Sequence, residues 1–72
     1  MEYTIFENAE PIGVYAGVSG EDSHGQFILF PLDLSDIATP GKFVKNESGE
    51  MYIILETTYA VVNDLRALKV YY

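Results

Sequence analysis

Side chains in the stretch 12–18 alternate more regularly than anywhere else in the chain. One set of alternate positions is aliphatic throughout: Ile12, Val14, Ala16 and Val18. The positions of the opposite set are Gly13, Tyr15 and Gly17. A two-residue repeat is the period of a β-strand, because successive side chains of a strand point to opposite faces. Two glycines within one strand further indicate a strong bend or the close approach of a neighbouring element.

Other stretches have the β-branched and aromatic composition that is typical of strands. The additional strands that we expect span residues 2–7, 26–30, 42–45 and 50–56. In the first of them, Tyr3 and Ile5 share one face. Residues 8–11 and 19–25 are predicted to be connections, the second of them a polar loop, and Pro31 is expected to end the strand 26–30.

Two further connections have recognisable turn residues. Ser35 and Asp36 are typical of a helix start, so one short helical turn is predicted within the irregular stretch 32–41. The sequence Asn-Glu-Ser-Gly at 46–49 is predicted to close a hairpin between the strands 42–45 and 50–56.

The segment 57–68 fits two structures. Its apolar residues follow a helical stripe with Thr57 as a cap, the members being Thr58, Val61, Val62, Leu65 and Leu68. Its β-branched and aromatic residues favour a strand at 59–62, a helical turn at 63–67 and a final strand at 68–72, since Asn63 and Asp64 are poor helix formers. We favour the strand–turn–strand interpretation.

The chain is therefore predicted to be a single domain, residues 1–72, with a mainly β fold. We expect a small antiparallel sheet or SH3-like barrel of five to six short strands with one or two helical turns; the resemblance to SH3-like barrels covers strand order only. The alternative is an α+β fold, in which an antiparallel sheet carries a C-terminal helix around 57–68. No cysteine is present, so the core must form without disulfides.

Charge is distributed unevenly along the sequence. Residues 1–41 include no lysine or arginine and seven carboxylates: Glu2, Glu7, Glu10, Glu21, Asp22, Asp33 and Asp36. The net charge is −7, so the surface is expected to repel nucleic acid and anionic membranes. The longest apolar runs are far shorter than a membrane span, and no targeting segment is visible. A cytoplasmic protein is the expectation.

Two polar clusters are candidates for catalytic or metal sites. Glu21-Asp22-Ser23-His24 combines carboxylates, a hydroxyl and an imidazole, but neighbouring side chains in a loop diverge and do not form a nucleophile–base pair. Asp33 and Asp36 could form a carboxylate pair for a cation or for acid–base chemistry, but solvation and the capping of a helical turn by Ser35 or Asp36 explain this stretch better. We expect no enzyme, no bound metal and no cofactor.

The charge and the six tyrosines favour a small acidic protein-interaction module. One form of this hypothesis is an inhibitor or decoy, of the kind found in phages and mobile elements, that fills the cationic groove of a nucleic-acid-handling protein. The alternative is an SH3-like structural or adaptor subunit of a larger assembly or a homo-oligomer. The expected partner is a protein with a basic surface. The residues expected to contact it are Glu7, Glu10, Glu21, Asp22, Asp33, Asp36, Tyr15, Tyr71 and Tyr72.

Overall fold

The computed structural model describes residues 1–72 as eight short strands in two four-stranded antiparallel sheets. The strands are β1 (Glu2–Glu7), β2 (Glu10–Ala16), β3 (Val18–Asp22), β4 (Gly25–Phe30), β5 (Phe43–Lys45), β6 (Met51–Ile53), β7 (Glu56–Val62) and β8 (Leu65–Tyr71). Sheet A has the order β2-β1-β5-β6, and sheet B has the order β3-β4-β8-β7. The predicted mainly β, antiparallel fold class is confirmed.

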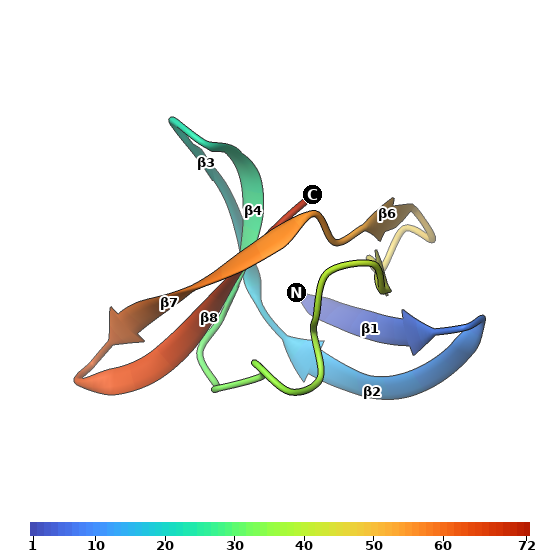
Figure 1. The fold of residues 1–72 in the computed structure, drawn as a ribbon, viewed down its shortest axis with the longest axis horizontal. Helices are drawn as coiled ribbons and strands as arrows, with labels where there is room; N and C mark the ends of the chain where they lie inside the picture. Colours follow the sequence, from blue (N-terminus) through green and yellow to red (C-terminus); the bar gives the residue numbers. More distant parts are fainter.

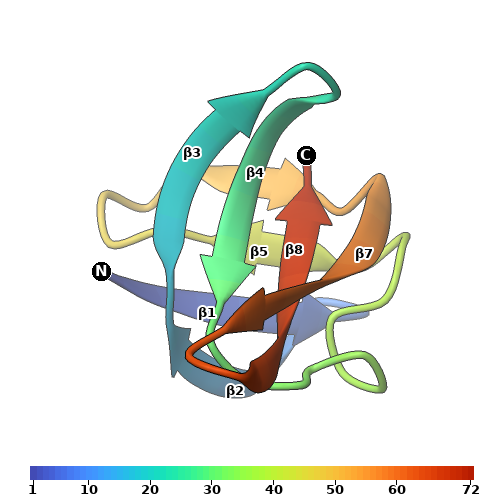
Figure 2. The ribbon, with the colours of Figure 1, turned by 90° about the vertical axis from the view of Figure 1, so that its left-hand side faces the viewer.

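Two bends in the chain connect the edges of the sheets. β2 continues into β3 through Gly17, and β6 continues into β7 through Ile54 and Leu55. Because both edges of sheet A run on into the edges of sheet B, the eight strands form six continuous lengths of chain that enclose one core. Figure 2 shows β3, β4 and β8 of sheet B running across β1 and β5 of sheet A.

Gly17 lies at the bend between β2 of sheet A and β3 of sheet B. Its amide donates a hydrogen bond to the Met1 carbonyl, with a distance of 2.9 Å. A Cβ atom at this position would lie 2.9 Å from Cγ2 of Ile28 and 3.1 Å from the ring of Phe30. The glycine signal in the sequence therefore marks both a bend and a close approach, as predicted.

Two tight hairpins have the same turn chemistry. Asn8 and Ala9 connect β1 to β2, while Asn63 and Asp64 connect β7 to β8; all four residues have positive φ angles, between 51° and 68°. Two central residues with positive φ define the turn whose twist matches that of paired strands. The predicted helical turn at 63–67 is wrong, and so is the alternative helix at 57–68, because β7 and β8 pair directly on either side of this turn.

The first connection is also shorter than predicted. Only Asn8 and Ala9 interrupt the strands, and Pro11 lies within β2 opposite Phe6. The pairing of β1 with β2 shifts between Ile5 and Phe6, which leaves Ile12 as an extra residue in a bulge. A strand at the edge of its sheet tolerates proline because its outward amide has no partner to lose.

The predicted polar loop at 19–25 is wrong. Residues up to Asp22 form β3 and pair with β4, and only Ser23 and His24 lie in the turn. The polar composition is compatible with a strand here because β3 is an edge strand with side chains in solvent. The pairing with β4 overrides the weak intrinsic preference of these residues for strands.

The hairpin predicted around 46–49 is confirmed. β5 pairs with β6 from Phe43 opposite Ile53 to Lys45 opposite Met51. The side-chain Oδ1 of Asn46 accepts hydrogen bonds from the amides of Ser48 (3.0 Å) and Glu50 (2.9 Å), which holds the loop closed.

The connection from β4 to β5 contains one turn, and no helix is formed. The carbonyl of Leu34 accepts hydrogen bonds from the amides of Ile37 (2.9 Å) and Ala38 (2.8 Å). The capping carboxylate is Asp33, whose Oδ1 accepts a hydrogen bond from the amide of Ser35. This turn brings Leu34 and Ala38 into the core, where both are buried.

The core lies between the sheets and is entirely hydrophobic. Its buried members are Tyr3, Ile5, Ile28, Phe30, Leu34, Ala38, Val44, Ile54, Leu68 and Val70. The inward face of β1 is the one that carries Tyr3 and Ile5. In β2, by contrast, the face with Gly13 and Tyr15 points to the core, and the aliphatic face points to solvent, with Val14 57% exposed.

Candidate protein-interaction surface

The outer face of sheet A is covered by apolar side chains from all four of its strands. We call this surface the apolar face of sheet A; it consists of Phe6, Ile12, Val14, Phe43, Met51 and Ile53. Strand pairing brings these side chains together, because Phe43 lies between Phe6 on β1 and Ile53 on β6. Four strands at their usual spacing make a face about 14 Å wide.

Much of this face is in contact with solvent. The exposed fractions of Val14, Met51 and Ile53 are 57%, 49% and 46%, and those of Ile12 and Phe43 are both 40%. Single exposed apolar side chains are common, whereas a continuous group across a whole sheet is typical of a surface that another molecule covers.

Carboxylates surround the apolar face at both ends of its strands. We call them the carboxylate rim; its members are the exposed residues Glu2, Glu7, Glu10, Glu47 and Glu50. Glu47 is held in place because its Oε1 accepts a hydrogen bond from the amide of Glu2, at 2.7 Å. Two cations lie nearby. Lys42 is 3.2 Å from Glu7, and Lys45 lies within the face between Thr4 and Met51.

The six carboxylates predicted to contact a partner are not gathered on one surface. Glu7 and Glu10 flank the β1–β2 turn, and Glu21 and Asp22 lie at the end of β3, on the opposite side of the molecule (Figure 1). Asp33 and Asp36 belong to the connection between β4 and β5.

Three of these six carboxylates are paired within the chain. Glu7 contacts Lys42, Asp22 contacts Lys69 at 2.9 Å, and Asp33 contacts Arg66 at 4.0 Å. Of the six carboxylates, only Glu7 and Glu10 adjoin the apolar face of sheet A.

The three tyrosines predicted as contact residues have packing roles in the structure. Tyr15 packs against the core, and Tyr71 is only 6% exposed. Tyr72 lies against Tyr52, with ring centroids 4.5 Å apart. Burial raises the pKa of both Tyr52 and Tyr72. The two C-terminal aromatics, which were predicted to contact a partner, therefore anchor the end of the chain.

Asp22 is the centre of a polar cluster on the outer face of sheet B. Its Oδ2 accepts hydrogen bonds from Nζ of Lys69 (2.9 Å) and the hydroxyl of Tyr71 (2.7 Å), and its Oδ1 accepts one from the amide of His24 (2.8 Å). The Lys69 ammonium also lies 4.4 Å from the ring centroid of Phe27. Through these contacts β3 is tied to β8 across β4.

The hydrogen bonds of this cluster alter three pKa values. Those from Lys69, and then from Tyr71, lower the pKa of Asp22 far below its ordinary value of 3.8. In turn, the Asp22 carboxylate raises the pKa of Lys69 and that of Tyr71. At neutral pH the cluster consists of the ionised Asp22 carboxylate, the Lys69 ammonium and the neutral Tyr71 phenol.

Replacing Asp22 with asparagine should lower the free energy of unfolding at neutral pH. The free energy of unfolding of this variant should also fall less steeply as the pH is lowered into the acid range. Because the folded pKa of Asp22 is lowered, its stabilising contribution is complete above pH 3.8 and is lost as pH falls towards the folded pKa. Urea unfolding as a function of pH measures the difference between wild type and Asp22→Asn, which should shrink below pH 3.8. Asp36→Asn, at an exposed position, is the matched control and should change little. A difference that stays constant into strong acid would contradict the assignment.

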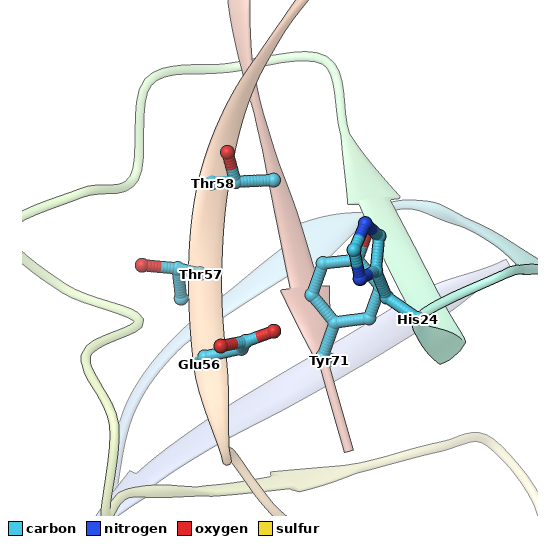
Figure 3. A pocket seen from close by; sticks show the side chains of 5 residues that line it. All are labelled: His24, Glu56, Thr57, Thr58 and Tyr71. Carbon is cyan, nitrogen blue, oxygen red and sulfur yellow. The ribbon is translucent and has the colours of Figure 1, made fainter.

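An open pocket of roughly 300 Å³ adjoins this cluster, lined by His24, Glu56, Thr57, Thr58 and Tyr71. Figure 3 shows Glu56 and Thr58 on β7 directed towards Tyr71, and Thr57 directed away. The one lining hydroxyl that is hydrogen-bonded to a carboxylate is that of Tyr71, and its acceptor, Asp22, also accepts a hydrogen bond from Lys69. No group of three or more histidine or acidic side chains is placed to hold a metal ion. No helical segment in the structure has the length and hydropathy of a membrane span.

The chain matches no protein-family model, and comparison with curated proteins and with solved structures gave no significant similarity. The function is therefore inferred from the surface itself. The apolar face of sheet A was not predicted, although a signal for it was present: the aliphatic set of 12–18 stands opposite a set with two glycines. Residues with no side chain cannot fill a core, but Tyr15 can cover the space beside them, as it does over Gly13.

Proposed function

We propose that the chain is a small protein-interaction module that docks through the apolar face of sheet A onto a partner with an apolar centre and a basic rim. The observation that carries this proposal is the group of apolar side chains that all four strands of one sheet present on its outer face, five of them 40–57% exposed. Such a face loses its contact with water on docking, and burial of apolar surface is the main driving force of association.

The carboxylate rim defines the chemistry of the partner. Five carboxylates stand around the apolar face, while the one cation that lies within it is Lys45. A surface with lysines or arginines around an apolar centre would complement both features. A second copy of the chain would instead bring two carboxylate rims together, so this face favours a different protein.

Of the two forms of the interaction hypothesis, the placement of the carboxylates and of the apolar face of sheet A supports a structural or adaptor subunit better than a groove-filling decoy. A decoy of nucleic acid needs carboxylates in a row, and here the predicted ones are distributed over opposite sides of the molecule (Figure 1). A subunit needs one apolar docking face with a charged border, which sheet A has.

The test compares two valines that are similarly exposed but lie on different surfaces. Val14, 57% exposed, is on the apolar face of sheet A, and Val18, 67% exposed, is on β3. We expect Val14→Lys to weaken partner binding at least about tenfold, because a buried ammonium must be desolvated, and Val18→Lys to leave it unchanged.

The measurement begins with tagged wild type and the two variants as baits, followed by titration of any purified protein that Val14→Lys alone fails to retain. Binding of that protein should weaken as salt is raised, because the carboxylate rim and a basic rim are screened. A partner that binds Val14→Lys as tightly as wild type would overturn the proposal. A partner lost only with Val18→Lys would move the docking site to sheet B.

A further inference from the structure

β7 is a long edge strand with one side unpaired. It occupies the end of sheet B and pairs along its whole length with β8, from Glu56 opposite Tyr71 to Val62 opposite Leu65. An edge strand presents a row of backbone N–H and C=O groups that can pair with another strand. The exposed fractions of Tyr59 and Val61 on this strand are 53% and 75%.

The other sheet edges have features that discourage pairing. β2 contains Pro11, Gly13 and a bulge, β3 contains a glycine and ends in two acids, and β6 is only three residues long. Proline, bulges, charge and short length are the usual devices that protect edges. Apart from Glu56 at its start, β7 has none of them, since the stretch 57–63 contains no charge, proline or glycine.

The hairpin geometry determines which backbone groups of β7 are free. Val62 and Leu65 close a two-residue hairpin, so this pair exchanges hydrogen bonds and every second pair after it does the same. Ala60 and Thr58 therefore bond to β8. The amides and carbonyls of the residues between them, Thr57, Tyr59 and Val61, point away from β8.

We propose that the free edge of β7 pairs with the β7 edge of a second copy of this chain, in an antiparallel two-fold arrangement. Full overlap of the seven-residue strands places Tyr59 opposite Tyr59 of the second copy and Thr57 opposite its Val61. This register uses all three outward residues on each strand and forms about six hydrogen bonds. It extends sheet B across both molecules.

Charge and shape support a second copy as the occupant. The chain has a net charge of −7, but pairing here joins its uncharged stretches, and Glu56 of one copy would lie opposite Val62 of the other. Like charges thus avoid facing each other across the ladder. Figure 1 shows the β7–β8 hairpin projecting away from sheet A, so two copies can pair at this edge while their bodies stay apart. The apolar face of sheet A is left free for its own partner.

The experiment measures self-association by sedimentation equilibrium of the intact chain and of matched variants. Val61→Lys places a charge on the edge and should weaken dimerisation at least about tenfold, while Val18→Lys and Val14→Lys leave it unchanged. Dimerisation of the wild type should strengthen with salt, because two acidic molecules repel each other less when screened. This is the opposite of the salt effect expected for the sheet A partner, so the two proposals succeed or fail separately.

Backbone amide exchange adds a readout specific to strand pairing. The amides of Tyr59 and Val61 should exchange rapidly in dilute solution and slowly in concentrated solution, while those of Thr58 and Ala60 are protected in both. A chain that stays monomeric up to millimolar concentration would overturn the proposal. So would a dimer that Val14→Lys abolishes and Val61→Lys does not, or one in which the Tyr59 amide exchanges at the same rate at every concentration.

Discussion

Replacing Phe30 with alanine should leave the chain largely unfolded at room temperature. Phe30 has no exposed surface and is the largest fully buried side chain. Its ring packs edge-to-face on Tyr3, with centroids 5.8 Å apart at 81°. Truncation of a buried phenylalanine costs about 3–5 kcal/mol, which is comparable to the whole stability that a core of this size supplies.

Phe43 is the matched control for this substitution. It is also a phenylalanine on a central strand pair, but it lies on the outer face of sheet A and is 40% exposed. Phe43→Ala should lower the free energy of unfolding by less than about 1 kcal/mol, the scale of a cross-strand pair. Circular dichroism and urea unfolding of both variants provide the comparison. If Phe30→Ala unfolds cooperatively at a midpoint near that of wild type, the core does not depend on this ring.

Adding a single methyl group at Gly17 should also destabilise the fold strongly. The new Cβ of Gly17→Ala would stand 2.9 Å from Cγ2 of Ile28 and 3.1 Å from the Phe30 ring, and both neighbours are completely buried. Overpacking of this kind costs about 1–3 kcal/mol. Alanine also restricts the unfolded chain more than glycine does, which stabilises the folded state by about 0.4–1 kcal/mol. The net change in the free energy of unfolding remains a loss.

Gly20 separates this effect from a general cost of replacing glycine in a strand. A Cβ at Gly20 would also be close to a neighbour, 2.6 Å from Cζ of Phe27, but Phe27 lies on the outer face of sheet B and the far end of its ring can turn towards solvent. Gly20→Ala should therefore be the milder change in urea unfolding. Equal losses for the two variants would argue against a tightly packed corner at Gly17.

Strand-forming segments were predictable because their signals are local. The segment 2–7 was placed within its observed bounds, with Tyr3 and Ile5 on one face, because alternation and β-branched composition depend only on neighbouring residues. The same holds for the hairpin around Asn46, whose side chain closes the loop through nearby amides. The Asn63-Asp64 turn also had a local signal, since both residue types tolerate positive φ, but it was misinterpreted as helical.

Side-chain contacts between strands that are distant in the sequence could not be predicted in the same way. Asp22 and Lys69 are far apart in the sequence, and only the order β3-β4-β8 brings their side chains to one carboxylate–ammonium pair. Because Asp22 is paired with Lys69, its carboxylate is not free to pair with a basic group of a partner. Conversely, Phe6, Phe43 and Ile53 come from three separate strands, and nothing in any one of these strands shows that the three adjoin.

The sequence by itself determined the β class of the protein, the places of most of its turns, a bend or close approach within 12–18 and the strongly negative charge. These properties follow from residue types and short-range periodicity, which act before any distant contact forms. The tertiary structure alone decided that the aliphatic side of 12–18 faces solvent, which carboxylates remain unpaired, and that β7 ends a sheet without protection. Each of these depends on what packs against a strand, and alternation sets the period of a strand without stating which face its neighbours will cover.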